Sequence, residues 1–557
     1  MSADAGAAGG GGWQRGAMLI ALAMLAPLLA LGWSAAQGSA GLWSHIAQHV
    51  LPTATANTLL LLLGVGLWVT ALGTGSAWLV TAYEFRGRRW LSWALLLPLA
   101  VPTYIIAYAY LDLLHPLGPV HGTLRAVLEI DNPRDLRLPE VRSLGGATVL
   151  LGFVLYPYVY LSTRAMFLTQ AAGLLEAARV LGVSGAALFH RVALPLARPA
   201  IAVGVALALL ETLNDIGASE FLGVQTLTVA VYTTWVSRSD LPGAAQIALV
   251  MLLIVIGLIA LERHGRRRQR YATPQQPRPI QPTRLHGAAA LAALLLGLVP
   301  VLLGFLVPAS FLLWQSIKRL RNESGISPQL IASAGNTVSV AVVATLATVA
   351  AGLVLAWALR LAQARRRPRA AAASMRIASL GYAVPGTVLA IGLLTPLALF
   401  DTAAGALLEL VGEEPRMLMM GSTSALVIAY SLRFLAITAG STEAGLARIP
   451  HSLDQAARSL GERPGGALQR VHLPLLRPAL AAGALLVFVD TMKELPATLM
   501  LRPMNFETLA TWLYADAARG SYEDGAIAAL LIVVAGLLPV ILLSRTRTPF
   551  GRGRAGA

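Results

Sequence analysis

The sequence predicts an all-α polytopic membrane protein with about 12 transmembrane helices, arranged as two parallel six-helix repeats. Of its 557 residues, 56% are hydrophobic and only 13% are charged, whereas a soluble domain carries about 25% charged residues. The mean hydropathy is +0.67. In addition, one loop sequence occurs twice, about half the chain apart. The composition indicates a membrane protein, and the repeat indicates two copies of one membrane unit.

Twelve apolar runs approach the length of about 20 residues that a spanning helix needs. The first half contains the runs 17–33, 58–83, 91–114, 146–168, 197–217 and 244–262. The second half contains the runs 288–315, 337–360, 374–400, 421–440, 478–500 and 526–544. A cleaved signal peptide is the alternative for the first run. We favour a retained helix, because both ends of the chain then lie on the same side of the membrane.

The repeated loop lies between the fourth and fifth runs of each half. The first copy, from Glu176 to Pro195, reads EAARVLGVSGAALFHRVALP, and the second, from Gln455 to Pro474, reads QAARSLGERPGGALQRVHLP. The two copies are 279 positions apart, Glu176 against Gln455. Other matching pairs share this offset, namely Asn57-Thr58 with Asn336-Thr337 and Glu211-Thr212 with Asp490-Thr491. The duplication therefore extends well beyond the loop.

Arginine clusters between the apolar runs predict the orientation in the membrane. They follow runs two, six and eight and close the chain, at 86–89, 263–270, 365–369 and 545–554. All four fall on one side if the N-terminus is inside, and the positive-inside rule makes that side the cytoplasm. Both repeated loops then face the cytoplasm, as do both termini. This placement also accounts for the net charge of +16 without nucleic-acid binding.

These features divide the chain into five parts. We expect a disordered N-terminal tail at 1–16, which is rich in Gly and Ala. A first membrane unit of six helices follows at 17–262, and a linker rich in Arg, Gln and Pro at 263–286 is expected on the cytoplasmic side. The second unit spans 287–545, and a basic tail at 546–557 ends the chain.

Each repeated loop is expected to form two short helices with a glycine reversal between them. Gly173 and Ser452 stand three residues before Glu176 and Gln455, so that they could cap the first helix in a capping-box arrangement. Gly182 and Gly461 permit the chain reversal. Ser184 and Pro464 then suit the start of the second helix.

This loop resembles the "EAA loop" of binding-protein-dependent ABC importer permeases. That pattern has Glu-Ala-Ala, a glycine six residues after the glutamate, and a later branched residue, any residue, Leu and Pro. The first copy fits throughout, and the second departs only at its first residue, which is glutamine. The matching positions are Glu176, Ala177, Ala178, Gly182, Leu194 and Pro195, and Gln455, Ala456, Ala457, Gly461, Leu473 and Pro474.

The resemblance implies a type I ABC importer-like fold and a set of partners. In this family the loop docks on an ATP-binding subunit, so two copies of that subunit are expected per chain, together with a periplasmic substrate-binding protein. It also implies a bacterial inner membrane location. The chain itself lacks the Gly-Lys-Ser/Thr of a phosphate-binding loop, because its only lysines are Lys318 and Lys493. We therefore expect a transport subunit, not an enzyme, with no cofactor of its own.

Four acidic residues in the fifth apolar runs are the candidates for a translocation path. Glu211 and Asp215 are four positions apart, as are Asp490 and Glu494, and such a spacing would put each pair on one helix face. Carboxylates are costly in hydrocarbon and usually face a wet cavity or a partner. The alternative is local pairing, since Lys493 is close to Asp490. No metal site is assigned, and Pro496 and Gly217 are expected to end these helices.

The strings ETLNDIGASEFLGV and DTMKELPATLMLRPMNFETLATWLY resemble the fused permeases of ferric-iron importers. Ferric iron is therefore the expected substrate, with thiamine or a phosphonate as alternatives within the same class. A proton-coupled secondary transporter would explain the duplication and the membrane carboxylates but not the paired loops. A membrane enzyme finds no support, because no nucleophile–base or metal-ligand pattern is present and cysteine is absent.

Overall fold

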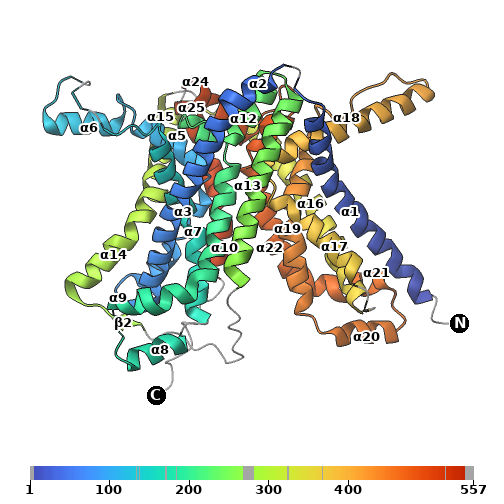
Figure 1. Ribbon diagram of the computed structural model, residues 1–557, viewed down its shortest axis with the longest axis horizontal. Coiled ribbons are helices and arrows are strands. Elements are labelled where there is room, and N and C mark those ends of the chain that lie inside the picture. The colour runs from blue at the N-terminus through green and yellow to red at the C-terminus, as the bar shows by residue number, and fades with distance from the viewer. Residues whose placement is uncertain are drawn as a thin grey trace. The chain divides into compact units, whose positions relative to one another are not determined.

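The structure is a computed structural model of the chain. It describes residues 5–39, 41–132, 135–136, 138–169, 172–183, 185–267, 282–322, 325–364, 366, 368–520 and 522–545. Within these residues the elements are helices, apart from two short strands (Figure 1). Most of the predicted linker, at 268–281, and the predicted basic tail at 546–557 lie outside the described residues.

The chain packs into two compact units that are interleaved in sequence. Unit 1 comprises 1–48, 230–252 and 326–512, and unit 2 comprises 49–229, 253–325 and 513–557. The predicted domains 17–262 and 287–545 therefore do not correspond to compact units. The reason is that the first helix of each half packs with helices of the other half.

Unit 1 combines the N-terminal helix with most helices of the second repeat. Its first helix packs along three helices of that repeat, α16, α17 and α18, as the blue and yellow-orange ribbons of Figure 1 show. The elements of unit 1 are α1 (Ala5–Ala36), α2 (Trp43–His45), α16 (Pro328–Ala364), α17 (Arg369–Ala378), α18 (Gly386–Leu410), α19 (Thr423–Ala447), α20 (His451–Ser459), α21 (Pro464–Ala467), α22 (Leu473–Met492) and α23 (Pro496–Leu501).

Unit 2 combines most helices of the first repeat with α14, α15 and α25. Its two strands, β1 (Tyr83–Glu84) and β2 (Thr283–Arg284), pair in parallel. Its helices are α3 (Leu51–Ala82), α4 (Arg88–Ala94), α5 (Thr103–Leu113), α6 (Pro119–Leu128), α7 (Leu144–Thr169), α8 (Ala172–Val180), α9 (Gly185–Leu188), α10 (Leu194–Asn214), α11 (Gly217–Phe221), α14 (Gly287–Val301), α15 (Val307–Asn322) and α25 (Tyr522–Arg545). The boundary between the units falls within α12 (Leu227–Tyr232), α13 (Leu241–Arg267) and α24 (Leu509–Arg519).

The predicted membrane fold is confirmed. In the described residues 11 helices are long and apolar enough to cross a membrane, or 12 if one bent pair forms a single span. The bent pair is the third predicted run, where the segments 88–100 and 103–113 meet at 91°. The predicted run 91–114 is therefore two helical segments that meet at a sharp bend. Pro98 and Pro102 explain the break, because proline removes a backbone donor and clashes with the preceding helical turn.

The N-terminal tail also differs from the expectation. The helix α1 begins at Ala5, so residues 5–16, for which disorder was predicted, continue the first apolar helix. Alanine has the highest helix propensity. Extending an existing helix also avoids the cost of nucleating a new one. These two effects offset the glycines at 9–12.

The two repeats share a close helix contact that depends on glycine. Gly73 on α3 faces α7, and Gly352 on α16 faces α19, 279 positions later. A Cβ added at Gly352 would lie 2.5 Å from Thr438 Oγ1 and 2.8 Å from the Ala439 nitrogen, and one at Gly73 would lie 2.6 Å from Val159 Cβ. Only glycine allows the two backbones to approach so closely.

The repeated Asn-Thr pair also has the same role in each unit. Asn57 donates to the Gln225 carbonyl, and Thr58 Oγ1 accepts from the backbone nitrogen of Leu227. Asn336 and Thr337 make the equivalent bonds to the Glu507 carbonyl and the Leu509 nitrogen. The pair therefore ties the start of a long helix to the segment that precedes α12 or α24.

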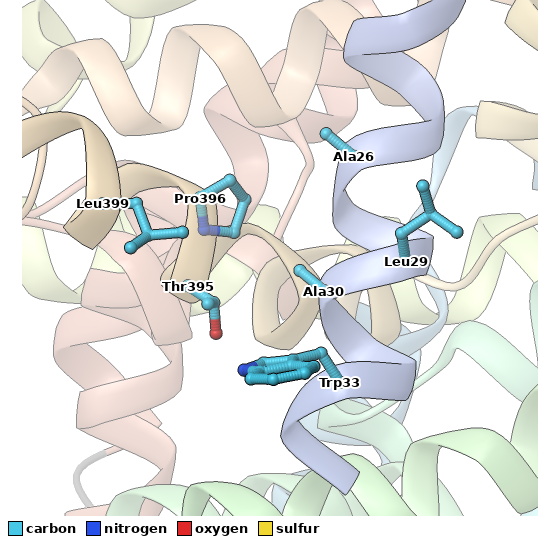
Figure 2. Close-up of a pocket in the computed structure, with 7 residues that line it drawn as sticks. All are labelled: Ala26, Leu29, Ala30, Trp33, Thr395, Pro396 and Leu399. Carbon is cyan, nitrogen blue, oxygen red and sulfur yellow. The ribbon is translucent and has the colours of Figure 1, made fainter. Parts of the chain in front are cut away.

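An apolar groove of about 420 Å³ lies between α1 and α18 in unit 1. Trp33 and Leu29 from α1 and Pro396 and Leu399 from α18 form its walls, as Figure 2 shows. Ser34 and Thr395 share a hydrogen bond between the same two helices. The residues that line the groove include no charged side chain, so it suits hydrocarbon and is not the candidate path.

We predict that Gly352→Ala destabilises the protein by about 1–3 kcal/mol, the usual cost of overpacking a tight contact. The measurement is the thermal unfolding midpoint of the purified chain in lipid nanodiscs. Gly335→Ala on the same helix is the control, because an added Cβ there meets nothing within 4 Å. Equal midpoints for the two variants would contradict the role of Gly352 in packing.

Candidate functional site

The repeated loop has the same backbone design in both units. The first short helix, α8 or α20, ends in a left-handed glycine, Gly182 with φ +86° or Gly461 with φ +81°. The nitrogen of Gly182 bonds to the Arg179 carbonyl and that of Val183 to the Ala178 carbonyl, each at 3.0 Å. The second loop repeats both bonds at 3.0 Å. This is the Schellman arrangement, which satisfies the last carbonyls of a helix.

The glycines are required by backbone conformation and not by space. A Cβ at Gly182 or Gly461 would meet nothing within 4 Å. However, a positive φ costs an ordinary L-residue about 1–2 kcal/mol. The left-handed glycine therefore fixes the direction in which the chain leaves the helix, while the space beside the turn stays open. Figure 1 shows α8 with α9 at one end of unit 2, and α20 with α21 at one end of unit 1.

The predicted helix starts differ from the observed ones. In the second loop α20 begins at His451, with Pro450 in the capping position and no side-chain cap. Ser452 therefore lies inside the first turn, and its capping-box pairing with Gln455 is wrong. The extended backbone of Pro450, with ψ 142°, places the start two residues earlier. In the first loop Gly173 lies inside α8, and Ser184 is outside the described residues.

One leucine in each loop is almost fully exposed. Leu181 and Leu460 directly precede the two glycines and are 83% and 85% exposed. In the first loop Val180 is 87% exposed as well. These side chains protrude from polar loops, which is typical of residues that fill a pocket on a partner. Neither leucine was among the predicted site residues. The sequence signal for both is a Leu-Gly dipeptide that recurs 279 positions later.

The other matched positions support the loop. Leu194 and Leu473 each begin the long helix that returns from it, α10 or α22. Pro195 and Pro474 come just after a π-helical turn, Phe189–Ala193 or Leu468–His472, that continues into this helix, and such a turn can accommodate a proline, which lacks a backbone donor. Glu176 is half-buried, and Gln455 is exposed. Ala177 and Ala456 are exposed, and Ala457 is buried. Ala178 is half-buried.

The four acidic residues do not form pairs on one helix face, which corrects the expectation. The helix α10 ends at Asn214 and α22 ends at Met492, so Asp215 and Glu494 lie in the breaks that follow. Gly217 and Pro496 begin the next short helices, α11 and α23. The i, i+4 rule does not apply across such a break.

Asp215 and Glu494, 279 positions apart, are buried and cap these short helices. Asp215 Oδ1 accepts from the nitrogens of Ala218 at 2.7 Å and Ser219 at 3.2 Å, and its other oxygen accepts from the Thr103 hydroxyl. Glu494 Oε1 accepts from the Ala497 nitrogen at 2.9 Å. Both carboxylates therefore satisfy backbone groups that a broken helix leaves free.

The buried carboxylate has different partners in the two units. Glu494 lies 3.5 Å from the guanidinium of Arg433 on α19, and both side chains are buried. The position equivalent to Arg433 in unit 2 is Val154, and Asp215 there has the Thr103 hydroxyl. A buried charge without a partner is costly. Glu494 is therefore paired with Arg433, whereas Asp215 is held by hydrogen bonds.

Glu211 and Asp490 are the more accessible members of each set. Both are half-buried. Asp490 pairs with Lys493 at 2.8 Å, which is the local pairing that the sequence left open. Among the described residues no group of three or more His, Asp or Glu side chains is arranged to hold a metal ion. Asp215 and Glu494 are thus helix caps and Asp490 forms a local ion pair, and Glu211 and Asp490 are less buried than the other two.

Comparison with known proteins identifies the family. The model of the binding-protein-dependent transport system inner membrane component matches twice, at residues 69–271 and 349–546. The Fe(3+)-transport system permease protein FbpB 2 of Haemophilus influenzae is 25% identical over 495 residues, covering 88% of this chain and 89% of the relative. 

Two relatives cover about one repeat. A probable molybdenum ABC transporter permease of Haloferax volcanii is 29% identical over 41% of this chain and 80% of its own length. A putative 2-aminoethylphosphonate transport system permease protein, PhnU of Salmonella choleraesuis, is 28% identical over 41% and 81%. The chain therefore belongs to the family of binding-protein-dependent transport system inner membrane components, and it is a fused ABC importer permease with two copies of the family unit.

Proposed function

We propose that one ATP-binding subunit docks on each repeated loop, and that its movement drives import through the chain. The observation that carries this proposal is the pair Leu181 and Leu460. Both are more than 80% exposed, and both are held by the same turn before a left-handed glycine. A rigid turn that presents one apolar side chain suits insertion into a pocket on a partner.

The loops are proposed to face the cytoplasm, where ATP is available. In unit 2 the arginine-rich turn after α3 includes Arg88, which donates to the Val80 carbonyl. The neighbouring β1 pairs with β2, next to the predicted linker. Figure 1 draws β2, α8 and α9 at one end of unit 2. Arginine at this end supports a cytoplasmic location by the positive-inside rule, and both termini are proposed to lie there as well.

Ferric iron, delivered by a periplasmic binding protein, is the proposed substrate. The relative named for Fe(3+) transport aligns over both repeats, with 88% of this chain covered, whereas those named for molybdenum and 2-aminoethylphosphonate align over 41%. A phosphonate or thiamine is the alternative. A proton-coupled transporter would leave the paired loops without a purpose.

We further propose that Glu211 and Asp490 contact the solute during transport, whereas Asp215 and Glu494 hold the helix breaks. The support is accessibility: the first two are half-buried and the last two are buried. Oxygen ligands suit hard cations such as ferric iron.

Replacing Leu181 or Leu460 by Asp is expected to weaken binding of the ATP-binding subunit by about tenfold or more, since burying a leucine contributes about 1.5–3 kcal/mol. The measurement is the dissociation constant of that subunit for the purified chain in nanodiscs. Leu410→Asp is the matched control, because Leu410 is 82% exposed at the end of α18, away from the loops. Unchanged affinity in both loop variants would contradict the docking proposal.

Glu494→Gln should lower thermal stability by about 3–5 kcal/mol, because Arg433 would remain buried without its partner. Asp490→Asn should leave stability within about 1 kcal/mol, since its ion pair with Lys493 is partly exposed, but should reduce uptake. Thermal unfolding and uptake into proteoliposomes measure the two effects. If Asp490→Asn transported normally, its proposed contact with the solute would be wrong.

The substrate assignment is tested on the periplasmic binding protein that supports uptake through this chain, with titration calorimetry of ferric iron, thiamine and 2-aminoethylphosphonate. We expect binding of ferric iron alone, and iron uptake when that protein is added to proteoliposomes holding the complex. Binding of thiamine or the phosphonate without iron would contradict the assignment.

A further inference from the structure

The second loop is joined to a membrane helix by a buried arginine. Arg360, in the last two turns of α16, is 5% exposed. Its Nη2 donates to Asp454 Oδ2 at 2.7 Å and its Nε to the same oxygen at 3.1 Å. Asp454 belongs to α20, the first helix of the loop, and is buried as well. The guanidinium thus donates two hydrogen bonds to the loop, and such charge-assisted bonds are stronger than those between neutral groups.

The same arginine also holds the end of α19, from which the loop departs. Its Nη1 donates to the Leu446 carbonyl, and its Nη2 donates to the Ile449 carbonyl at 3.0 Å. The Leu446 carbonyl, in the last turn of α19, also accepts from the Ile449 nitrogen at 3.0 Å, and Ile449 itself lies just beyond the end of the helix. One side chain from α16 therefore fixes both the end of α19 and the start of α20.

A buried histidine completes the contact from the far side of the loop. His472 Nε2 lies 2.8 Å from Asp454 Oδ1, although its direction is not that of a hydrogen bond. The His472 ring is 4.8 Å from the ring of Trp357, one turn before Arg360 on α16. Burial alone would raise the pKa of Asp454. The hydrogen bonds and charge of Arg360, with His472 and His451, hold that pKa below its ordinary value.

The first loop lacks all three members of this contact. At the offset of 279, Arg360 corresponds to Thr81, Asp454 to Leu175 and His472 to Ala193. Thr81 donates to the Ala77 carbonyl of its own helix. Among the described residues, the ring of Trp78 on α3 lies 5.4 Å from that of Phe189, beyond α9. Thr81, Leu175 and Ala193 therefore cannot form the charged contact that joins α20 to α16 in the second loop.

We propose that Arg360 is a positioning residue for energy coupling, which fastens the second docking loop to α16, so that the two loops transmit the movement of their ATP-binding subunits unequally. This inference rests on the proposed docking function. The second loop moves with α16 as one body, while the first moves more independently of α3. In the second loop Gln455 is exposed at the position where the first loop has Glu176. The carboxylate of the second loop belongs instead to the neighbouring Asp454, which is buried.

Spin-label mobility tests the attachment without any ATP-binding subunit. The chain has no cysteine, so Val180→Cys on α8 and Ser459→Cys on α20 give single labels at equivalent positions. In nanodiscs we expect the label at 459 to be less mobile than that at 180. Arg360→Gln should bring the mobility at 459 up to that at 180 and leave the label at 180 unchanged. Equal mobility before the substitution, or no change after it, would overturn the proposal.

Two further variants keep this test interpretable. Arg360→Met with Asp454→Leu removes both charges together, so that it folds without an unpaired buried charge, and the label at 459 should again become mobile. Arg470→Gln is the matched control, because it removes the ion pair of Arg470 with Glu462 in the same loop, where Arg470 is 75% exposed. Mobility at 459 should not respond to it. A rise as large as that in Arg360→Gln would overturn the specific role of Arg360.

The coupling role is then measured in the complete complex. Arg360→Gln should keep the affinity for the ATP-binding subunit, but lower solute transported per ATP hydrolysed by roughly 5–150-fold, the usual range of coupling between sites. Arg360→Lys should recover part of it. Unchanged coupling would overturn the proposal. If the unaltered chain bound no ATP-binding subunit, the docking proposal would be wrong. The spin-label experiment would still test the attachment of the second loop to α16, because it needs no ATP-binding subunit.

Discussion

Every break in a helix leaves backbone N–H and C=O groups that need partners, and within a membrane water does not supply them. The need for partners at helix ends accounts for much of the polar chemistry of the chain, in the membrane helices and in the loops alike. Asp215 and Glu494 cap the short helices that follow a break. Gly182 and Gly461 close the loop helices through the backbone itself. Arg360 satisfies carbonyls at the end of α19. The places where the helices stop are therefore the places where charged and left-handed residues occur.

Duplication provided two copies of this design, and the copies have since diverged. The backbone features are shared, including the close approach at Gly73 and Gly352 and the reversal in each loop. The charges differ. The second repeat has Arg433 beside its buried carboxylate and Arg360 beside its loop, and the first repeat has neither. The structure therefore combines a symmetric set of helices with an asymmetric set of ion pairs, so equal roles for the two loops do not follow from the repeat.

Local backbone rules were readable from the sequence, whereas long-range partners were not. The helix count and the reversal at the loop glycines followed from hydropathy and from the Gly at a matched offset. The predicted cap at Ser452 was wrong because Pro450 caps the helix two residues earlier. The prediction that each carboxylate pair shares a helix face was wrong because the helices end at Asn214 and Met492, before Asp215 and Glu494. Gly217 and Pro496 were the sequence signals for these breaks. The interleaved units and the contact of Arg360 with Asp454, 94 positions away, leave no periodic pattern. The signal available for that contact was a lone arginine at the end of an apolar run.

The most direct test of the account is the composition of the complex formed with the partner ATPase. Native mass spectrometry of the chain, purified with its ATP-binding subunit, counts the copies bound to each chain. Two docking loops predict two ATP-binding subunits per chain, reduced to one when Leu181 or Leu460 alone is replaced by Asp. A complex with a single ATP-binding subunit, or one that keeps both copies after both leucines are replaced, would contradict the central claim.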